Sequence, residues 1–248
     1  MDNELCQKLV ALADKYEMAS FCDDDPSQYL RWYSDGRVAD VECASFVAAM
    51  LAFGSRSQFI PKIALILKTA DNYGGISHWI NLGSPSFPHG TKKFYRFYSY
   101  DDMHVLFLEL SKIIKDSGTL GNYFKKQYID NPQIPLSQLI SQAFPTSALV
   151  PKGKTSACKR LHMFLRWMVR QNSPVDLGLW NWYSPSNLLL PLDTHVMQQS
   201  IKMGLLPPKT APSFKTAVLL TQKMSQIFPG DPTRADFALF GLGVDFGV

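Results

Sequence analysis

The chain has 248 residues, 46% of them apolar, and a formal net charge of +4. A chain of this length and composition buries a full core in one large domain or in two lobes, so disorder is not the default expectation. No apolar run approaches the ~20 residues that span a membrane, and the acidic start at Met1–Glu4 is unlike a signal peptide, so we expect a cytoplasmic protein without a membrane partner.

The four cysteines, Cys6, Cys22, Cys43 and Cys158, lie far apart in the chain. They match neither the CxxC spacing of a metal site nor the compact framework of a disulfide-rich domain. We therefore expect reduced, buried thiols, no bound metal and no cofactor.

The spacing of apolar residues predicts an all-α protein, because most of them recur every three or four residues and strand signals are scarce. In chain order, we expect helices at Leu5–Tyr16, Pro26–Tyr33, Val41–Phe53, Gln58–Tyr73, Asp102–Lys115, Leu120–Tyr128, Leu136–Phe144, Ser156–Arg170 and Thr194–Met203. Asp40 is the expected N-cap of the third helix, which is apolar on nearly every side and should be central. Loops are expected at Gly83–Gly90 and Asn131–Pro135, where Gly and Pro gather.

The charges are unevenly distributed. Residues 1–50 hold almost half of the 21 acidic residues, whereas no Asp or Glu lies between Asp130 and Asp176. The cations of that interval are Lys152, Lys154, Lys159, Arg160, Arg166 and Arg170. On the helix expected there, Lys159, His162, Met163, Arg166 and Arg170 share one face. A polyanion such as nucleic acid would suit this face, although a merely solvated basic face has the same pattern.

Two features flank this helix. The turn Val150–Thr155 places Gly153 between lysines just before a helix start, an arrangement that suits a phosphate. Downstream, Asp193 follows the apolar run Leu188–Leu192 and precedes a helix that Gly204 closes. Asp193 is at least an N-cap, and at the end of an apolar run it also holds a carboxylate rigidly at a partly dry site.

These segments resemble the helix-hairpin-helix superfamily of base-excision DNA glycosylases. The resemblance covers about residues 40–245 and depends on the order of its parts: a central apolar helix, a hairpin-like turn, a lysine on the next helix, LDTHV with its helix at residues 192–206, and a last helix that contains Asp231–Gly243. The chain also looks like an uncharacterised bacterial family marked by ACKRLxMFLRWMVR and PLDxH, similar to the archaeal 8-oxoguanine glycosylase branch.

The resemblance implies a single catalytic unit of two helical lobes with a cleft between them, one lobe at about 1–40 plus 173–248 and the other at about 41–172. It implies a monomer that binds damaged double-stranded DNA and removes a purine such as 8-oxoguanine. The catalytic pair is Lys159 and Asp193, with Lys154 as the second choice for the lysine. The implied DNA contacts are Lys152, Gly153, Lys154, Arg160, Arg166 and Arg170, and the implied base pocket contains Trp167 and Trp180.

The chain departs from the superfamily pattern in two places. The usual LPGVGxKT hairpin is only approximated by Val150–Thr155, so Lys154 fits the local motif whereas Lys159 fits the wider spacing to the aspartate. The four-cysteine motif after the last helix is missing, so no iron–sulfur cluster is expected. The sequence leaves open whether strand cleavage accompanies base removal. It also leaves open a non-catalytic DNA-binding protein, or a helical scaffold for an acidic protein.

Overall fold

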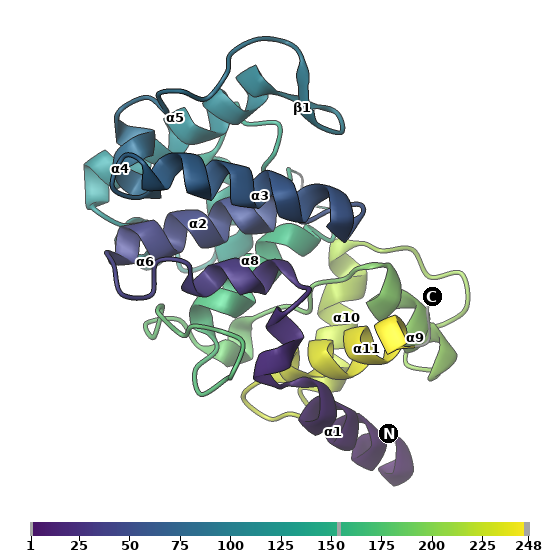
Figure 1. Cartoon of the computed structure of the whole chain (residues 1–248). Coiled ribbons are helices and arrows are strands. Elements are labelled where there is room, and N and C mark those ends of the chain that lie inside the picture. Colours follow the sequence, from purple (N-terminus) through teal and green to yellow (C-terminus); the bar gives the residue numbers. More distant parts are fainter. Residues whose placement is uncertain (1, 153–154, 246–248) are drawn as a thin grey trace. The chain divides into compact units, whose positions relative to one another are not determined.

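The computed structural model describes residues 2–152 and 155–245. The described chain is mostly helical, and its one sheet is a two-stranded antiparallel hairpin (Figure 1). In the part of the chain that the structure describes, none of the helices has the length and apolar character needed to cross a membrane.

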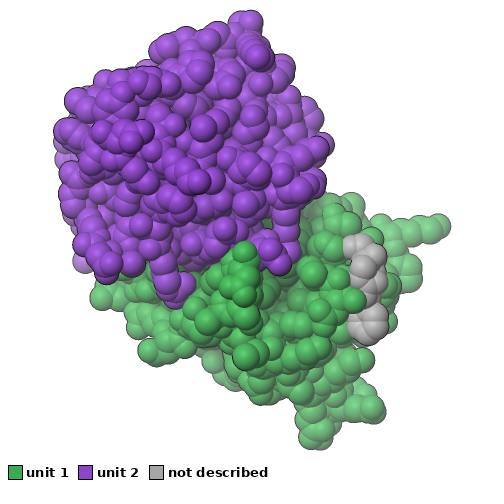
Figure 2. Space-filling view, in the orientation of Figure 1, with its two compact units in different colours: residues 1–23, 153–248 green, residues 24–152 purple. Residues whose placement is uncertain are grey.

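The chain forms two compact units, coloured separately in Figure 2. Unit 1 comprises residues 1–23 and 153–248, and unit 2 comprises residues 24–152. These boundaries differ from those expected from the sequence, because residues 24–40 belong to unit 2 and residues 153–172 to unit 1. The 3-10 helix η2 (Pro26–Arg31) packs against α2 of unit 2, whereas the helix at Lys159–Val169 forms its ion pairs with acids of unit 1.

Unit 2 is built around α2 (Val38–Leu51), which is buried from Asp40 to Leu51. The prediction that this helix is central is therefore confirmed. The other elements of the unit are η2, α3 (Arg56–Asp71), α4 (Ile76–Asn81), β1 (Lys93–Tyr95), β2 (Tyr98–Ser99), α5 (Tyr100–Ser117), α6 (Leu120–Asp130) and α7 (Leu136–Ala143). Of these, η2, α3, α4 and α6 pack against α2. The sequence patterns missed α4 and the hairpin, both of which are too short to show a period.

Buried carboxylates in unit 2 hold the ends of neighbouring elements. Asp40 does not cap α2 as predicted, because the helix begins at Val38, three residues before the predicted start at Val41. It instead accepts a hydrogen bond of 2.7 Å from the backbone N–H of Ser77 in the first turn of α4. Glu42 does the same for Gly121 in α6, at 3.1 Å. A carboxylate is favourable at a helix N-terminus because it satisfies free N–H groups and the helix dipole.

Unit 1 contains α1 (Asn3–Tyr16), η1 (Ala19–Cys22), α8 (Lys159–Val169), η3 (Pro185–Asn187), α9 (Thr194–Lys202), α10 (Phe214–Met224), η4 (Pro232–Arg234) and α11 (Ala235–Asp245). Figure 1 shows α1 and α9 beside α11, which packs against both. Two glycines of α11 make this possible. A Cβ at Gly241 would overlap the ring of Tyr16, and one at Gly243 would lie 2.7 Å from Cβ of His195. Both positions therefore require a residue without a side chain.

Candidate functional site

The structure brings together the two residues predicted to be catalytic. Lys159 Nζ lies 3.8 Å from Asp193 Oδ2, although 34 residues separate them in the sequence (193 − 159). Their side chains are 30% and 15% exposed, so the pair is partly dry but open to solvent. Both residues belong to unit 1.

Lys159 is placed by the start of α8. Cys158, the residue before the helix, has a φ of 43°, and its carbonyl accepts the N–H groups of Leu161 and His162 at 2.9 and 3.2 Å. Just upstream, the carbonyl of Thr155 accepts the N–H of Phe214, at 2.8 Å. The helix entry is thus tied to a distant segment of unit 1, and this tie fixes where the lysine stem leaves the backbone.

Asp193 uses its two carboxylate oxygens for different purposes. Oδ1 accepts the N–H of Val196 at 2.8 Å and so caps α9, as predicted. Oδ2 faces Lys159. The cap holds the carboxylate in one orientation, so its second oxygen stays directed at the amine.

A second acidic residue, Asp236, lies near this pair. It is buried in the first turn of α11 and forms an ion pair with Arg166 Nη1. Burial raises the pKa of Asp236 to about 6; the charge of Asp193 also raises it, while Arg166 and Lys159 oppose the change. Asp236 therefore takes up a proton at a higher pH than an exposed aspartate does, and it lies beside the pair formed by Lys159 and Asp193. The sequence did not indicate that Asp236 lies beside Lys159 and Asp193, because an aspartate in a first helical turn is ordinarily explained by the helix dipole.

The structure contradicts the predicted exposure of Arg166 and Arg170. Both side chains are 3% exposed, so neither faces solvent or a DNA backbone. Arg166 pairs with Asp176 at 3.2 Å and with Asp236. In the fold, the positive charges of Arg166 and Arg170 are thus paired with acidic residues that lie outside the acid-free stretch of the sequence.

Arg170 lies at the centre of an extended network of buried charges. It pairs with Glu17 at 2.7 Å, with Asp176 at 2.5 Å and with Asp231 at 2.8 Å. The guanidinium groups of Arg166 and Arg170 lie 4.4 and 5.2 Å from the ring centre of Phe237, the residue after Asp236. These contacts join α1, α8 and α11, so the C-terminal half of α8 is structural, whereas its first residue belongs to the site.

The two tryptophans predicted to line a base pocket are buried. Trp167 is fully enclosed, and Trp180 packs edge-on against Phe164 with their ring centres 5.3 Å apart. Both rings are buried, so neither faces solvent. The neighbouring Trp182 instead lines a pocket of about 530 Å³ with Arg170, Gln171, Asn172, Asn181, Tyr183, Ser184, Pro185 and Asp231.

The remaining predicted DNA contacts have different surroundings. Lys152 belongs to unit 2, and its ammonium group donates to the carbonyls of Ser141, at 3.1 Å, and Phe144 at the end of α7. Burial lowers the pKa of Lys152. Gly153 and Lys154 lie outside the described residues. Arg160 is half-buried beside Lys159. Lys152 thus supports a helix end, and Arg160 adjoins Lys159 in the chain.

His162 was predicted on the polar face of α8 but is buried, and its Nε2 has no hydrogen-bond partner among the described residues. Burial lowers its pKa to about 4 from 6.5, so the folded protein holds the imidazole neutral. A folded-state pKa below the unfolded one gives stability that is present above pH 6.5 and is lost as the pH falls towards 4.

We therefore predict that His162→Leu changes the pH dependence of stability. Between pH 6.5 and 4, the wild-type unfolding free energy should fall relative to the variant by about 3 kcal/mol, since each pKa unit corresponds to ~1.4 kcal/mol. Urea unfolding of both proteins across this range measures the difference, and His78→Leu, at an exposed position of α4, is the control. If the difference in unfolding free energy between the two proteins did not change with pH, the prediction would be wrong. His162 would then be protonated in the folded state as readily as in the unfolded state.

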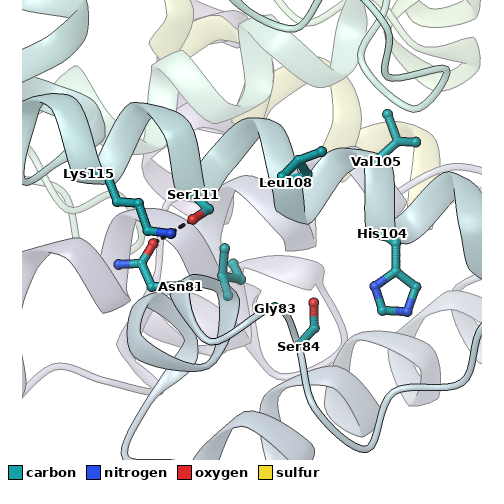
Figure 3. A pocket seen from close by; sticks show the side chains of 9 residues that line it. Asn81, Gly83, Ser84, His104, Val105, Leu108, Ser111 and Lys115 are labelled. Atoms are coloured by element: carbon teal, nitrogen blue, oxygen red, sulfur yellow. Dashed lines mark hydrogen bonds between the residues drawn. The ribbon is translucent and has the colours of Figure 1, made fainter.

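Unit 2 has a pocket of its own, shown in Figure 3. Its volume is about 330 Å³, and its lining comes from α4, the following turn and α5: Ile80, Asn81, Gly83, Ser84, His104, Val105, Leu108, Ser111 and Lys115. A hydrogen bond of 2.8 Å from Ser111 Oγ to Asn81 Oδ1 spans one end of it. The pocket contains no residue of the predicted site. Across the described residues, no group of three or more His, Cys, Asp or Glu side chains is placed to hold a metal ion.

Comparison with known proteins gives one result. No curated protein and no solved structure matches the chain. A family model matches residues 25–245, which include Lys159, Asp193 and Asp236. The chain therefore belongs to the family described as protein of unknown function (DUF2400).

Proposed function

We propose that the protein is a DNA glycosylase of the helix-hairpin-helix type, which removes a damaged purine such as 8-oxoguanine from duplex DNA. The observation that carries the proposal is the 3.8 Å approach of Lys159 Nζ to Asp193 Oδ2. A primary amine beside a fixed carboxylate, both partly exposed, is suited to attack on a sugar carbon whose positive charge must be stabilised.

In the proposed reaction the damaged nucleotide is turned out of the duplex so that its sugar reaches the site. The bond between C1′ and the base nitrogen breaks, and its electron pair leaves with the base. Asp193 Oδ2 stabilises the positive charge that develops on the sugar. The neutral amine of Lys159 forms a bond to C1′, and one of its two protons neutralises the departed base. The other proton passes to the ring oxygen as the sugar ring opens, which gives an imine between Lys159 and C1′.

The amine must be neutral to react, and a lysine in water has a pKa near 10.4. Lys159 is the first residue of α8, and Arg160 follows it in the chain. Asp236 is a nearby carboxylate whose charge interacts with those of Lys159 and Asp193. Asp236 is therefore the positioning residue that we propose for the site.

Other properties of the chain fit this proposal. Lys159, Asp193 and Asp236 come from one chain, so a monomer suffices. Cys6, Cys22, Cys43 and Cys158 are free thiols, as is usual in the reducing cytoplasm. The fold is mostly helical, in keeping with the resemblance. The contacts to DNA that we retain are Lys154 and Arg160, because Arg166 and Arg170 are buried.

Borohydride trapping on an 8-oxoguanine duplex tests the assignment of the lysine. The wild type should form a covalent adduct with DNA, and Lys159→Gln should abolish it because the imine nitrogen is gone. Lys202→Gln, at an exposed lysine of α9, is the control and should leave the adduct unchanged. An adduct that persists in Lys159→Gln and disappears in Lys154→Gln would transfer the role to Lys154.

The second candidate function is a protein that binds DNA without acting on it. It predicts duplex affinity that survives removal of both Lys159 and Asp193, with no adduct on any lesion. Burial of Arg166 and Arg170 counts against it, because it removes two cations from the surface on which this alternative depends.

A further inference from the structure

The β-hairpin of unit 2 carries an exposed set of aromatic and cationic side chains. Its strands, β1 and β2, are joined by the two-residue turn Arg96–Phe97, within the segment that connects α4 to α5 (Figure 1). No Asp or Glu lies between Asp71 and Asp101, and this interval holds Lys92, Lys93 and Arg96.

Phe97 is the most informative residue of the turn. Its side chain is 62% exposed, which is unusual for a ring of this size on a two-residue turn. The ring is nearly parallel to that of half-buried Phe53, with centres 6.0 Å apart and planes at 17°. The Arg96 guanidinium lies 5.3 Å from the centre of Phe97 and 5.7 Å from that of Phe53. An exposed aromatic face is thus bordered by a cation.

The turn is held firmly in this arrangement. Tyr95 donates its hydroxyl hydrogen to the carbonyl of Phe53, and Lys93 Nζ donates to the carbonyl of Phe97 at 2.6 Å. Gly54 leaves room for the turn, because a Cβ there would overlap the Arg96 guanidinium. Arg96 itself has a φ of 50°, a conformation that costs a non-glycine residue energy and that hairpin turns ordinarily assign to Gly or Asn. The Phe97 ring is therefore displayed by a rigid support, with little ordering left to be done on binding.

The cations extend beyond the turn. Lys92 and Lys93 are exposed, and Lys62 Nζ of α3 lies 4.9 Å above the ring of Phe94. The nearest acidic residues along the chain, Asp101 and Asp102, accept hydrogen bonds from backbone N–H groups. Asp101 Oδ1 accepts the N–H of Gly90 at 2.7 Å, and Asp102 Oδ2 accepts the N–H of Ser99 at 2.7 Å. The hairpin and the residue before it supply three exposed cations, Lys92, Lys93 and Arg96, and the charge of Asp102 acts on Lys93.

We propose that this surface, defined by Lys62, Lys92, Lys93, Arg96 and Phe97, binds nucleic acid with unpaired bases. An unpaired base offers a flat face for stacking on Phe97, and the phosphates on either side of it match the lysines and Arg96. An acidic polypeptide would satisfy the cations but not the exposed ring. A regular duplex would satisfy the cations while keeping its base faces stacked. The site lies in unit 2 and does not rest on the chemistry proposed for Lys159 and Asp193.

The test is binding of an undamaged, fluorescently labelled 20-nucleotide single strand, measured by anisotropy for the full-length protein. Phe97→Ala should weaken binding by about tenfold or more, the usual effect of losing one stacked base, and Phe97→Tyr should restore it. Lys92→Ala should reduce the slope of log affinity against log salt by about 0.7, as expected for one phosphate contact to a single strand.

Leu108→Ala and Lys125→Ala are the matched controls, since they remove an exposed apolar side chain and an exposed cation from other helices of unit 2. Both should bind as the wild type does. Equal affinity of Phe97→Ala and wild type would overturn the proposal, as would tighter binding to poly-glutamate than to the single strand. Because the probe has no damaged base, failure of excision by the Lys159 site leaves this result unaffected.

Discussion

Replacing Arg170 with alanine is expected to lower the free energy of unfolding by about 3–5 kcal/mol, the usual result of removing one partner from a buried ion pair. Arg170 is buried among Glu17, Asp176 and Asp231, and Asp176 is itself fully enclosed. Burial already raises the pKa of Asp176 against the opposing charges of Arg166 and Arg170. Without Arg170, Asp176 must either remain charged with one partner or take up a proton.

Urea and thermal unfolding measure this effect. Arg234→Ala is the matched control, because Arg234 pairs with Glu17 and Asp14 in the same network but is partly exposed. It should cost much less, since Asp14 is exposed to solvent and Glu17 keeps its pair with Arg170. If Arg170→Ala instead kept wild-type stability and lost affinity for DNA, Arg170 would be a surface contact, as its place in the sequence first indicated.

The second large effect is expected for Asp193→Asn. Excision of the damaged base should slow by roughly two to three orders of magnitude, as when one preorganised electrostatic group is lost from an active site. Stability should hardly change, because the asparagine carbonyl oxygen still accepts the Val196 N–H and asparagine caps a helix about as well as aspartate. Melting temperature, duplex affinity and single-turnover excision are measured on one preparation.

Asp193→Ala separates the two roles of this side chain. It removes the cap as well as the charge, so it should lose about 1 kcal/mol of stability in addition to the loss of excision. Excision by Asp193→Asn at the wild-type rate would refute the catalytic role of Asp193 and leave it as a helix cap. If Asp193→Asn also lost affinity for duplex DNA, Asp193 would contribute to DNA binding rather than to the chemical step.

Local signals in the sequence were sufficient for the helical class, whereas the pairing of Lys159 with Asp193 was expected from the resemblance to the glycosylase superfamily. The three-to-four-residue spacing predicted α1, α2, α3, α5, α6, α7, α8 and α9 close to their observed ranges. Asp193 was recognised as an N-cap because capping depends on the neighbouring three residues alone. The same local rule failed at Asp40, whose carboxylate serves α4 instead of its own helix.

The tertiary structure alone decided the surroundings of these residues. A helical face of Arg166 and Arg170 looks solvated in sequence, but Asp231 and Asp236, more than 60 residues away, are brought to it (231 − 170 = 61; 236 − 166 = 70). The same long-range packing enclosed Trp167 and Trp180, placed Asp236 near Lys159, and moved the unit boundaries to residues 24 and 152.

The hairpin was missed because strands of three and two residues show no alternation. Burial and charge pairing depend on which distant segments meet, whereas helix periods and caps depend on neighbours in the chain.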